Sequence, residues 1–298
     1  MQQNIRKELI RVTIDCNANC FFCNFCRENE KDFINPTKQE LINKIDDLAK
    51  SGANYIVFSG GEPLIYKDIM AIIFQAKKNG FKDIELQTNA LALDDKMVEE
   101  LKNSGLTRLF ISLHSHNNQI NKKLFNSFYD TNLVVGNIKK LNQKGFKITL
   151  NPVVNSLTYK LLPAFAKFIV ENFPWLESVS LSIMQPHGRG YLNKNLLPNY
   201  KEIESAISIF RDLLNKNNIK VVNPYCGLPM CIANWHRYPE DNVEYAENYI
   251  EKRQDQNKVY LNSCNKCKFQ FLCNGVWREY PQIFGEREVN SWLRPVKI

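Results

Sequence analysis

The sequence predicts an α/β fold, in which a partial (βα)6, TIM-like barrel over residues 1–217 precedes a small cysteine-rich module over residues 218–298. Up to about residue 217, short apolar runs alternate with longer helix-like stretches. The short runs read as apolar throughout, which is typical of a parallel sheet covered by helices. With 298 residues and 44% hydrophobic content, the chain is large enough to bury one such core with a modest appendage.

The βα repeat can be followed along the chain. Strands are expected at residues 9–14, 54–60, 83–89, 108–114, 146–154 and 178–186. Helices are expected at residues 37–52, 67–80, 94–105, 133–145 and 200–218. Several helices end on a glycine just before the next strand, which predicts left-handed C-caps at Gly52, Gly80, Gly105 and Gly145.

Cysteine-containing and polar segments follow the expected strands directly. They read "CNANCFFC", "SGGEP", "QTN", "SLHSH" and "QPHGRG" in chain order. Active sites of folds of this class lie at the C-terminal ends of the strands. We therefore expect these segments to gather on one rim of the barrel.

Composition excludes several classes of protein. No window has the apolar length of a signal peptide or membrane span, so we expect a soluble, cytoplasmic protein. The net charge of +8 is spread along the chain and gives only weak support for nucleic-acid binding. In a reducing compartment, the nine cysteines indicate metal binding or redox chemistry and not disulfides.

The first cysteine cluster has the spacing of a metal site. Cys16, Cys20 and Cys23 follow the pattern CxxxCxxC, and Cys26 lies three residues further on. A zinc knuckle held by all four thiolates fits this spacing, and so does an iron–sulfur cluster held by the first three. The spacing alone leaves both alternatives open.

A second motif lies one expected strand later, where "GGEP" follows an apolar run. CxxxCxxC with Phe22 before its last cysteine, followed by GGEP, resembles the signature of the radical S-adenosylmethionine (SAM) superfamily. The resemblance implies a [4Fe-4S] cluster on the catalytic residues Cys16, Cys20 and Cys23, with an open iron that binds SAM. It implies an iron–sulfur oxidoreductase that cleaves SAM to a 5′-deoxyadenosyl radical. Cys26 is not expected to be a ligand, because a fourth thiolate would close that iron.

The resemblance also implies residues that contact SAM. Glu62 would accept a hydrogen bond from the ammonium group of SAM, and the neighbouring glycines would let the backbone approach the ligand. The cofactor-binding residues expected in this way are Phe22, Gly60, Gly61, Glu62, Pro63, Thr88, Asn89, Ser112 and Arg189. His114 and His116 are interpreted as polar lining of the cavity.

The second cysteine set lies in the C-terminal module and comprises Cys226, Cys231, Cys264, Cys267 and Cys273. Zinc fits CxxC spacing, but the CxxCxxxxxC run resembles the SPASM or twitch extension of radical SAM enzymes, which carries auxiliary [4Fe-4S] clusters. Trp277 stands where the full pattern has a further cysteine. One auxiliary cluster is therefore expected, with either Cys231 or Cys226 as the fourth ligand. Whether it is an electron conduit or a substrate-binding site stays open.

The sequence motifs specify the radical chemistry but not the substrate. By analogy with the family, we expect a ribosomally made peptide that is crosslinked or epimerised, or a protein that is matured. The expected partners are that peptide or protein, a separate leader-recognition protein and a reductant such as flavodoxin or ferredoxin. The first strand begins close to Met1, which makes a small-molecule substrate, such as a sugar, nucleotide or cofactor precursor, the alternative. A non-enzymatic zinc-binding interaction protein is the second alternative.

Overall fold

A computed structural model describes residues 5–242, 257–270, 272–273 and 275–297. The chain forms two compact units. The first comprises Met1–Leu113 and Asn117–Leu150, and the second comprises His114–His116 and Asn151–Ile298. The predicted division after residue 217 follows the change in composition and stays a prediction.

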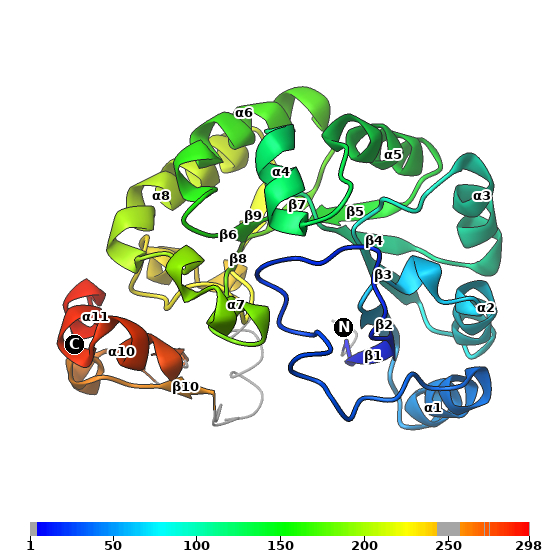
Figure 1. Ribbon diagram of the computed structural model, residues 1–298, viewed down its shortest axis with the longest axis horizontal. Coiled ribbons are helices and arrows are strands. Elements are labelled where there is room, and N and C mark those ends of the chain that lie inside the picture. The colour runs from blue at the N-terminus through cyan, green and yellow to red at the C-terminus, as the bar shows by residue number, and fades with distance from the viewer. Residues whose placement is uncertain (1–4, 243–256, 271, 274, 298) are drawn as a thin grey trace. The chain divides into compact units, whose positions relative to one another are not determined.

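The first unit is a parallel sheet whose strands neighbour one another in chain order. Its strands are β1 (Lys7–Thr13), β2 (Tyr55–Gly60), β3 (Asp83–Thr88), β4 (Arg108–Ile111) and β5 (Lys147–Leu150). Its helices are α1 (Lys38–Lys50), α2 (Ile69–Lys78), α3 (Asp95–Ser104), α4 (Asn118–Phe125) and α5 (Thr131–Gln143). Figure 1 shows α1, α2, α3 and α5 along one side of these strands. The predicted α/β alternation is confirmed, and the four predicted C-cap glycines all have a positive φ.

One face of this sheet is apolar and packs against the helices. Ile56, Phe58, Ile84 and Leu86 are at most 1% exposed and form the centre of the core. The neighbouring positions on β3 are polar, because Asp83, Glu85 and Gln87 alternate with the buried apolar residues. The expectation of strands that are apolar throughout is therefore wrong for β3, which follows the two-residue alternation of a strand with two different faces.

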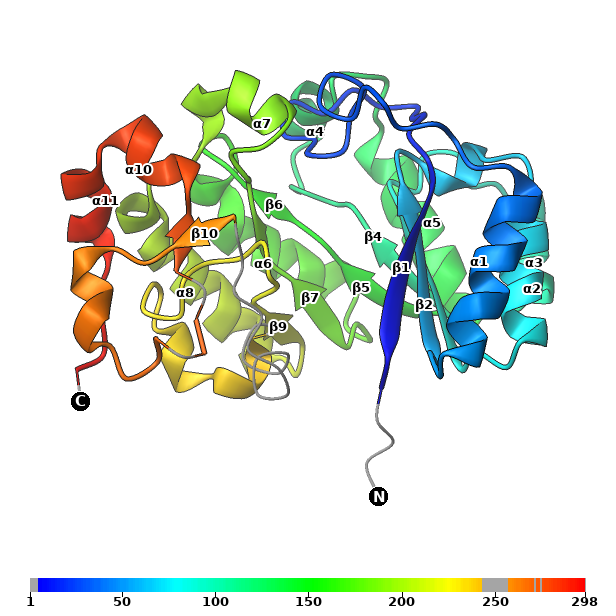
Figure 2. The ribbon, with the colours of Figure 1, turned by 90° about the horizontal axis from the view of Figure 1, so that it is seen from below.

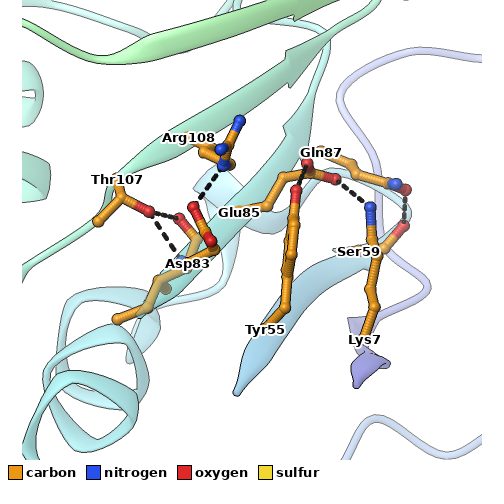
Figure 3. Close-up of polar contacts among 9 residues, drawn as sticks. Lys7, Tyr55, Ser59, Asp83, Glu85, Gln87, Thr107 and Arg108 are labelled. Carbon is orange, nitrogen blue, oxygen red and sulfur yellow. Dashed lines mark hydrogen bonds and ion pairs between the residues drawn. The ribbon is translucent and has the colours of Figure 1, made fainter. Parts of the chain in front are cut away.

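The polar residues on the opposite face of the sheet satisfy one another (Figure 3). Glu85 is 5% exposed, accepts a hydrogen bond from the hydroxyl of Tyr55 and lies 3.5 Å from the Nζ of Lys7. The Nε of Arg108 lies 2.5 Å from Asp83. Burial, together with the charge of Glu85, raises the pKa of Tyr55 well above its usual range. Paired in this way, charged side chains are tolerated on a largely enclosed surface.

The second unit contains two parallel strand pairs and a set of C-terminal elements. The pairs are β6 (Val153–Val154) with β8 (Ser182–Ile183), and β7 (Ser178–Ser180) with β9 (Lys220–Val222). The helices are α6 (Leu162–Asn172), α7 (Arg189–Leu192) and α8 (Tyr200–Lys216). The C-terminal elements include β10 (Lys258–Val259), β11 (Val276–Trp277), α10 (Glu279–Phe284) and α11 (Glu286–Trp292).

The last two expected strands are each broken in two. The segment 146–154 is interrupted at Asn151–Pro152, because proline has no N–H to continue a ladder. The segment 178–186 is interrupted at Leu181. The side-chain amide of Asn151 bridges the second break, because it donates to the backbone oxygen of Ser180 and to the Oγ of Ser182, both at 2.7 Å.

Aromatic side chains attach the C-terminal helices to α8. The rings of Tyr200 on α8 and Tyr280 on α10 stack with centroids 4.6 Å apart, and Trp292 on α11 lies 5.8 Å from Tyr200. The Nε1 of Trp292 donates to Glu288 at 2.9 Å.

Among the described residues, no helix is both long enough and apolar enough to cross a membrane.

The ends of β1 and β2 approach each other unusually closely. The backbone N–H of Gly61 donates to the oxygen of Thr13 at 2.7 Å, and that of Glu62 donates to Asp15 at 2.8 Å. A Cβ atom on Gly61 would lie 2.2 Å from the oxygen of Asp15 and 2.5 Å from that of Ile14. Glycine is therefore required here by contact between two backbones, whatever ligand binds nearby.

We predict that Gly61→Ala destabilises the protein by about 3 kcal/mol, because two backbone segments must separate to admit the methyl group. Gly136→Ala is the matched control. Gly136 lies within α5 and a Cβ there would meet nothing within 4 Å, so this change should stabilise by about 0.5–1 kcal/mol. Thermal or denaturant unfolding measures both, and equal effects of the two substitutions would contradict the steric argument.

Candidate functional site

The first cysteine cluster lies on the segment between β1 and α1. Cys16 is exposed, whereas Cys20 and Cys23 are partly exposed. The backbone N–H groups of Asn19 and Phe21 donate to carbonyl oxygens in the last turn of α4, at 2.9 and 3.1 Å. Figure 2 shows this segment beside α4. The last carbonyl groups of a helix have no hydrogen-bond partner within the helix. These two hydrogen bonds therefore satisfy carbonyl groups at the end of α4 and hold the cysteine segment against that helix.

Asp15 closes the base of the segment. Its carboxylate accepts hydrogen bonds from Asn35 at 2.6 Å and from a guanidinium nitrogen of Arg27 at 3.1 Å. Arg27 also donates to the backbone oxygen of Phe33 at 3.0 Å. The hydrogen bond from Arg27 is the main cause that holds the pKa of Asp15 below its usual value. The residue before Cys16 is thus connected to the residue after Cys26, which limits the conformations of the thiols between them.

Cys26 differs from the other three thiols because it is buried, with 4% exposure. Its Sγ lies 3.8 Å from the backbone oxygen of Cys23. Phe25 is also buried and packs edge-on against Phe33 at 5.1 Å. The side chains of this part of the segment belong to its packed base, and a ligand set without Cys26 stays our prediction.

Glu62 of the GGEP motif is 1% exposed. Its carboxylate accepts hydrogen bonds from the backbone N–H of Leu64 at 3.0 Å, the hydroxyl of Thr88 at 2.7 Å and the backbone N–H of Asn89 at 2.8 Å. Burial raises the pKa of Glu62 to about 7, and these hydrogen bonds oppose that shift. In this structure the carboxylate therefore positions the end of β3. A contact with the ammonium group of SAM stays a prediction.

A further hydrogen bond connects the end of β3 to the cysteine segment. The side-chain amide of Asn89 donates to the Oδ1 of Asn17 at 2.7 Å. The backbone N–H of Ser112, at the end of β4, donates to the oxygen of Thr88 at 2.9 Å. Glu62, Asn89 and Asn17 thus form a chain from the GGEP motif to the residue next to Cys16. The first unit brings together most of the residues expected to contact SAM.

Arg189 lies in the second unit, where it is the first residue of the short helix α7. His114 is also in this unit and is 2% exposed. Its Nδ1 accepts a hydrogen bond from the backbone N–H of Val153 at 3.1 Å, and burial lowers the pKa of His114 to about 3. Burial therefore favours the neutral imidazole of His114, and its place in the lining of the cavity stays a prediction. The ring of His116 lies beside those of Phe165 and Phe168, with centroids 6.4 and 6.1 Å away.

Four cysteines of the second set line one pocket in the second unit. They are Cys231, Cys264, Cys267 and Cys273. The backbone N–H of Cys267 donates to the oxygen of Cys264 at 3.0 Å, which forms the tight turn expected of a CxxC pair. Burial is the main cause that raises the pKa of Cys231 to about 12, and the nearby Cys273 adds to it. These thiols are close enough to influence one another.

Cys226 is not part of this pocket. Its Sγ donates to the Oγ of Ser182 on β8 at 3.1 Å. Burial raises the pKa of this thiol, and the hydrogen bond to Ser182 opposes the shift. Of the two cysteines that the sequence left as alternatives, Cys231 is the one that lies with the CxxCxxxxxC run.

The described residues contain no group of three His, Cys, Asp or Glu side chains arranged to hold a metal ion as they stand. Whether a metal group fits therefore depends on the chemistry of the donors. Four soft sulfur donors in one pocket are the ligand set of a cubane cluster, and they also suit zinc. Three thiols on one anchored segment, one exposed and two partly exposed, suit a cluster with an open iron.

Several residues of the site were missed by sequence reasoning. Asn17 and Asp15 are adjacent to Cys16, but nothing in the sequence indicates their partners at Asn89 and Arg27. In the sequence Trp277 stands out only as a replacement for a cysteine, although its ring packs against that of His187 with centroids 5.0 Å apart. The sequence offers one signal for Asp15 and Asn17, namely that both are polar residues next to a metal-ligand motif.

Residues 10–169 match the family described as the radical SAM superfamily. The probable GTP 3',8-cyclase of Methanocaldococcus jannaschii is 32% identical over 251 residues, which cover 82% of this chain and 80% of that protein. The GTP 3',8-cyclase of Clostridium botulinum is 39% identical over 150 residues, which cover 49% of this chain and 46% of that protein.

Solved structures with a similar fold include Streptococcus suis SuiB bound to S-adenosylmethionine. It has a TM-score of 0.62 at 19% identity and covers 72% of this chain and 49% of that one. Native anSMEcpe with bound AdoMet has a TM-score of 0.62 at 15% identity and covers 96% of this chain and 97% of that one. At these identities the likeness supports the fold, a partial α/β barrel, and not the substrate.

The buried carboxylate of Glu62 predicts a characteristic pH dependence of stability. Because its pKa is raised from 4.5 to about 7 on folding, its contribution is complete below pH 4.5 and is lost as the pH rises through 7. The shift corresponds to roughly 3 kcal/mol. Glu62→Gln has no charge to bury, so the difference in unfolding free energy between wild type and variant should change by this amount between pH 4.5 and 7.

Glu40→Gln is the control, because the pKa of Glu40 is lowered on folding whereas that of Glu62 is raised. Glu40 closes the capping box of α1, and the backbone N–H of Thr37 is the main cause that lowers its pKa. The advantage of wild type over this variant should therefore be present above pH 4.5 and shrink as the pH falls. Chemical denaturation at a series of pH values measures both. A Glu62→Gln profile parallel to that of wild type would contradict the role of burial.

Proposed function

The chain belongs to the radical SAM superfamily, and from this premise we propose that it acts on a nucleotide-like small molecule and not on a peptide. Enzymes of this superfamily use a [4Fe-4S] cluster and SAM, and they need a reductant. The single observation that carries the choice of substrate is the 32% identity to a probable GTP 3',8-cyclase over 82% of the chain.

The comparisons favour this alternative over the peptide substrate that the sequence first suggested. SuiB has been solved with its precursor peptide, but the 19% identity to that structure speaks only for the fold. No observation on the described residues supports a leader-recognition protein. A nucleotide substrate needs neither a leader peptide nor such a partner.

The roles proposed for the residues of the first unit are supported by the cysteine motif and by the hydrogen bonds of Glu62 and Asn89. Cys16, Cys20 and Cys23 would hold the cluster that binds SAM. When bound, that cluster would supply the electron for reductive cleavage of SAM, which is the source of the radical chemistry on the substrate. Glu62 and Asn89 hold the segment that carries Cys16 in a fixed position relative to the ends of β2 and β3. Such support from buried hydrogen bonds is what keeps metal ligands in place.

We propose that the second thiol pocket holds an auxiliary [4Fe-4S] cluster with Cys231 as the fourth ligand. The four thiols that line this pocket would provide one ligand for each iron of a cubane cluster and so leave no iron vacant. This favours a role in electron transfer over direct binding of the substrate. Zinc in this pocket, in a protein without enzymatic activity, is the competing interpretation. That interpretation does not account for the buried hydrogen bonds that connect Glu62 through Asn89 to Asn17, next to Cys16.

Anaerobically reconstituted and reduced protein should cleave SAM to 5′-deoxyadenosine. We expect GTP to stimulate this cleavage several-fold, because a bound substrate consumes the radical, and we expect short peptides to have no effect. Cys16→Ala should abolish cleavage in both cases, because it removes one of three cluster ligands. Chromatographic measurement of 5′-deoxyadenosine decides this, and stimulation by peptides without any response to GTP would refute the choice of substrate.

Cys231→Ser combined with Cys264→Ser should lower the iron content from about eight to about four atoms per chain, because the two thiolates left in the pocket are too few to hold a cubane cluster. Cys226→Ser combined with Cys264→Ser is the matched control. The thiol of Cys226 bonds to Ser182 outside the pocket, so three thiolates remain in the pocket and the iron content should stay close to the wild-type value. Iron analysis after reconstitution measures both. Loss of iron in the Cys226 variant alone would reverse the assignment, and zinc in the wild-type pocket would end it.

A further inference from the structure

Three neighbouring side chains of the second unit each hold a buried polar atom with no hydrogen-bond partner among the described residues. The atoms are the Nε2 of His187, the Nε1 of Trp277 and the Oε2 of Glu279. The rings of His187 and Trp277 are nearly perpendicular with centroids 5.0 Å apart, and the Nδ1 of His187 lies 3.8 Å from Glu279. The three residues come from the segment after β8, from β11 and from the start of α10.

Such a cluster is unusual for a packed interior. Trp277 is 2% exposed, and an unmade hydrogen bond at a buried donor destabilises a folded protein. Another tryptophan of the same unit is satisfied, because the Nε1 of Trp292 donates to Glu288 at 2.9 Å. Trp277 and Glu279 have the same donor and acceptor groups as Trp292 and Glu288, but they form no hydrogen bond with each other. Other buried atoms of this unit also lack a partner, for example the Nε1 of Trp235, but here three such atoms belong to neighbouring side chains, and together they could bind one ligand.

The indole N–H is held in a fixed place. Trp277 pairs with Lys258 in the two-stranded sheet of β10 and β11. The Nζ of Lys258 lies 4.9 Å from the centre of the Trp277 ring and donates to the backbone oxygen of Tyr225 at 2.7 Å. The ring of Tyr225 packs edge-on against Trp277 at 5.5 Å. A recognition group whose orientation is fixed by packing loses little entropy when it binds its ligand.

We propose that His187, Trp277 and Glu279 recognise the base of a purine nucleotide and favour guanine over adenine. On one edge, guanine carries two adjacent N–H donors for a carboxylate and a carbonyl oxygen for an indole N–H. Adenine presents a ring-nitrogen acceptor at that edge, which a carboxylate repels. This inference rests on the proposed function. It also gives the substrate a binding group, since an auxiliary cluster with four thiolates has no open iron to offer.

The test is equilibrium binding of GTP, ITP and ATP to the reconstituted holoenzyme, measured by anaerobic calorimetry. Wild type should bind GTP most tightly. Glu279→Gln should weaken GTP about 10- to 100-fold, with less effect on ITP, which lacks the 2-amino group, and none on ATP. Trp277→Phe should weaken GTP and ITP equally, because both carry the carbonyl oxygen. Glu288→Gln, whose carboxylate already pairs with Trp292, should leave the order of affinities unchanged.

The outcomes separate this inference from the function on which it rests. If wild type binds GTP and forms 5′-deoxyadenosine with it, but both variants keep the wild-type ratio of GTP to ATP affinity, the three atoms only bind water and the inference is wrong. If wild type binds none of the three nucleotides, the proposed function is wrong and the inference falls with it. Near-ultraviolet circular dichroism of each variant confirms that it is folded before binding is measured.

Discussion

The arrangement around the first cysteine cluster depends on one buried carboxylate. Glu62 has almost no exposed surface, so its oxygens must find donors inside the protein, and the end of β3 supplies two of them. A carboxylate that lost either donor would keep the cost of burial without its compensation. The conformation at Thr88 and Asn89 is therefore fixed by the requirement to satisfy Glu62, and Asn89 passes that constraint on to Asn17.

The close contact of β1 with β2 places Glu62 where it can act in this way. Because Gly61 has no side chain, the backbone after β2 hydrogen-bonds directly to the oxygens of Thr13 and Asp15. Asp15 in turn pairs with Arg27 on its exposed side. The segment that carries the three thiols is thus held by backbone contacts below and by a surface ion pair at its base. The surface pair contributes little energy, so the buried contacts dominate.

Under the proposed function, different side chains of the second unit would serve electron transfer and recognition of the substrate. The pocket of four thiols offers sulfur alone, which suits a closed cluster. His187, Trp277 and Glu279 offer nitrogen and oxygen atoms with unused hydrogen-bonding capacity, which suits an organic ligand. Enzymes of one superfamily that share radical chemistry differ in such side chains, so substrate specificity is expected to reside there and not in the cysteine motifs.

The sequence by itself determined the alternation of strands and helices in the first unit, the glycine C-caps and the radical SAM motif, because these depend on neighbouring residues. It did not determine which of Cys226 and Cys231 joins the CxxCxxxxxC run, or what Glu62 contacts. The contacts of Glu62 depend on residues distant in the sequence. Asn89, which donates to Glu62, is 27 residues away from it, and Asn89 in turn donates to Asn17, which is 72 residues away. Only tertiary packing decides them, because burial removes water as an alternative partner and leaves each polar group dependent on whichever distant group the fold brings to it.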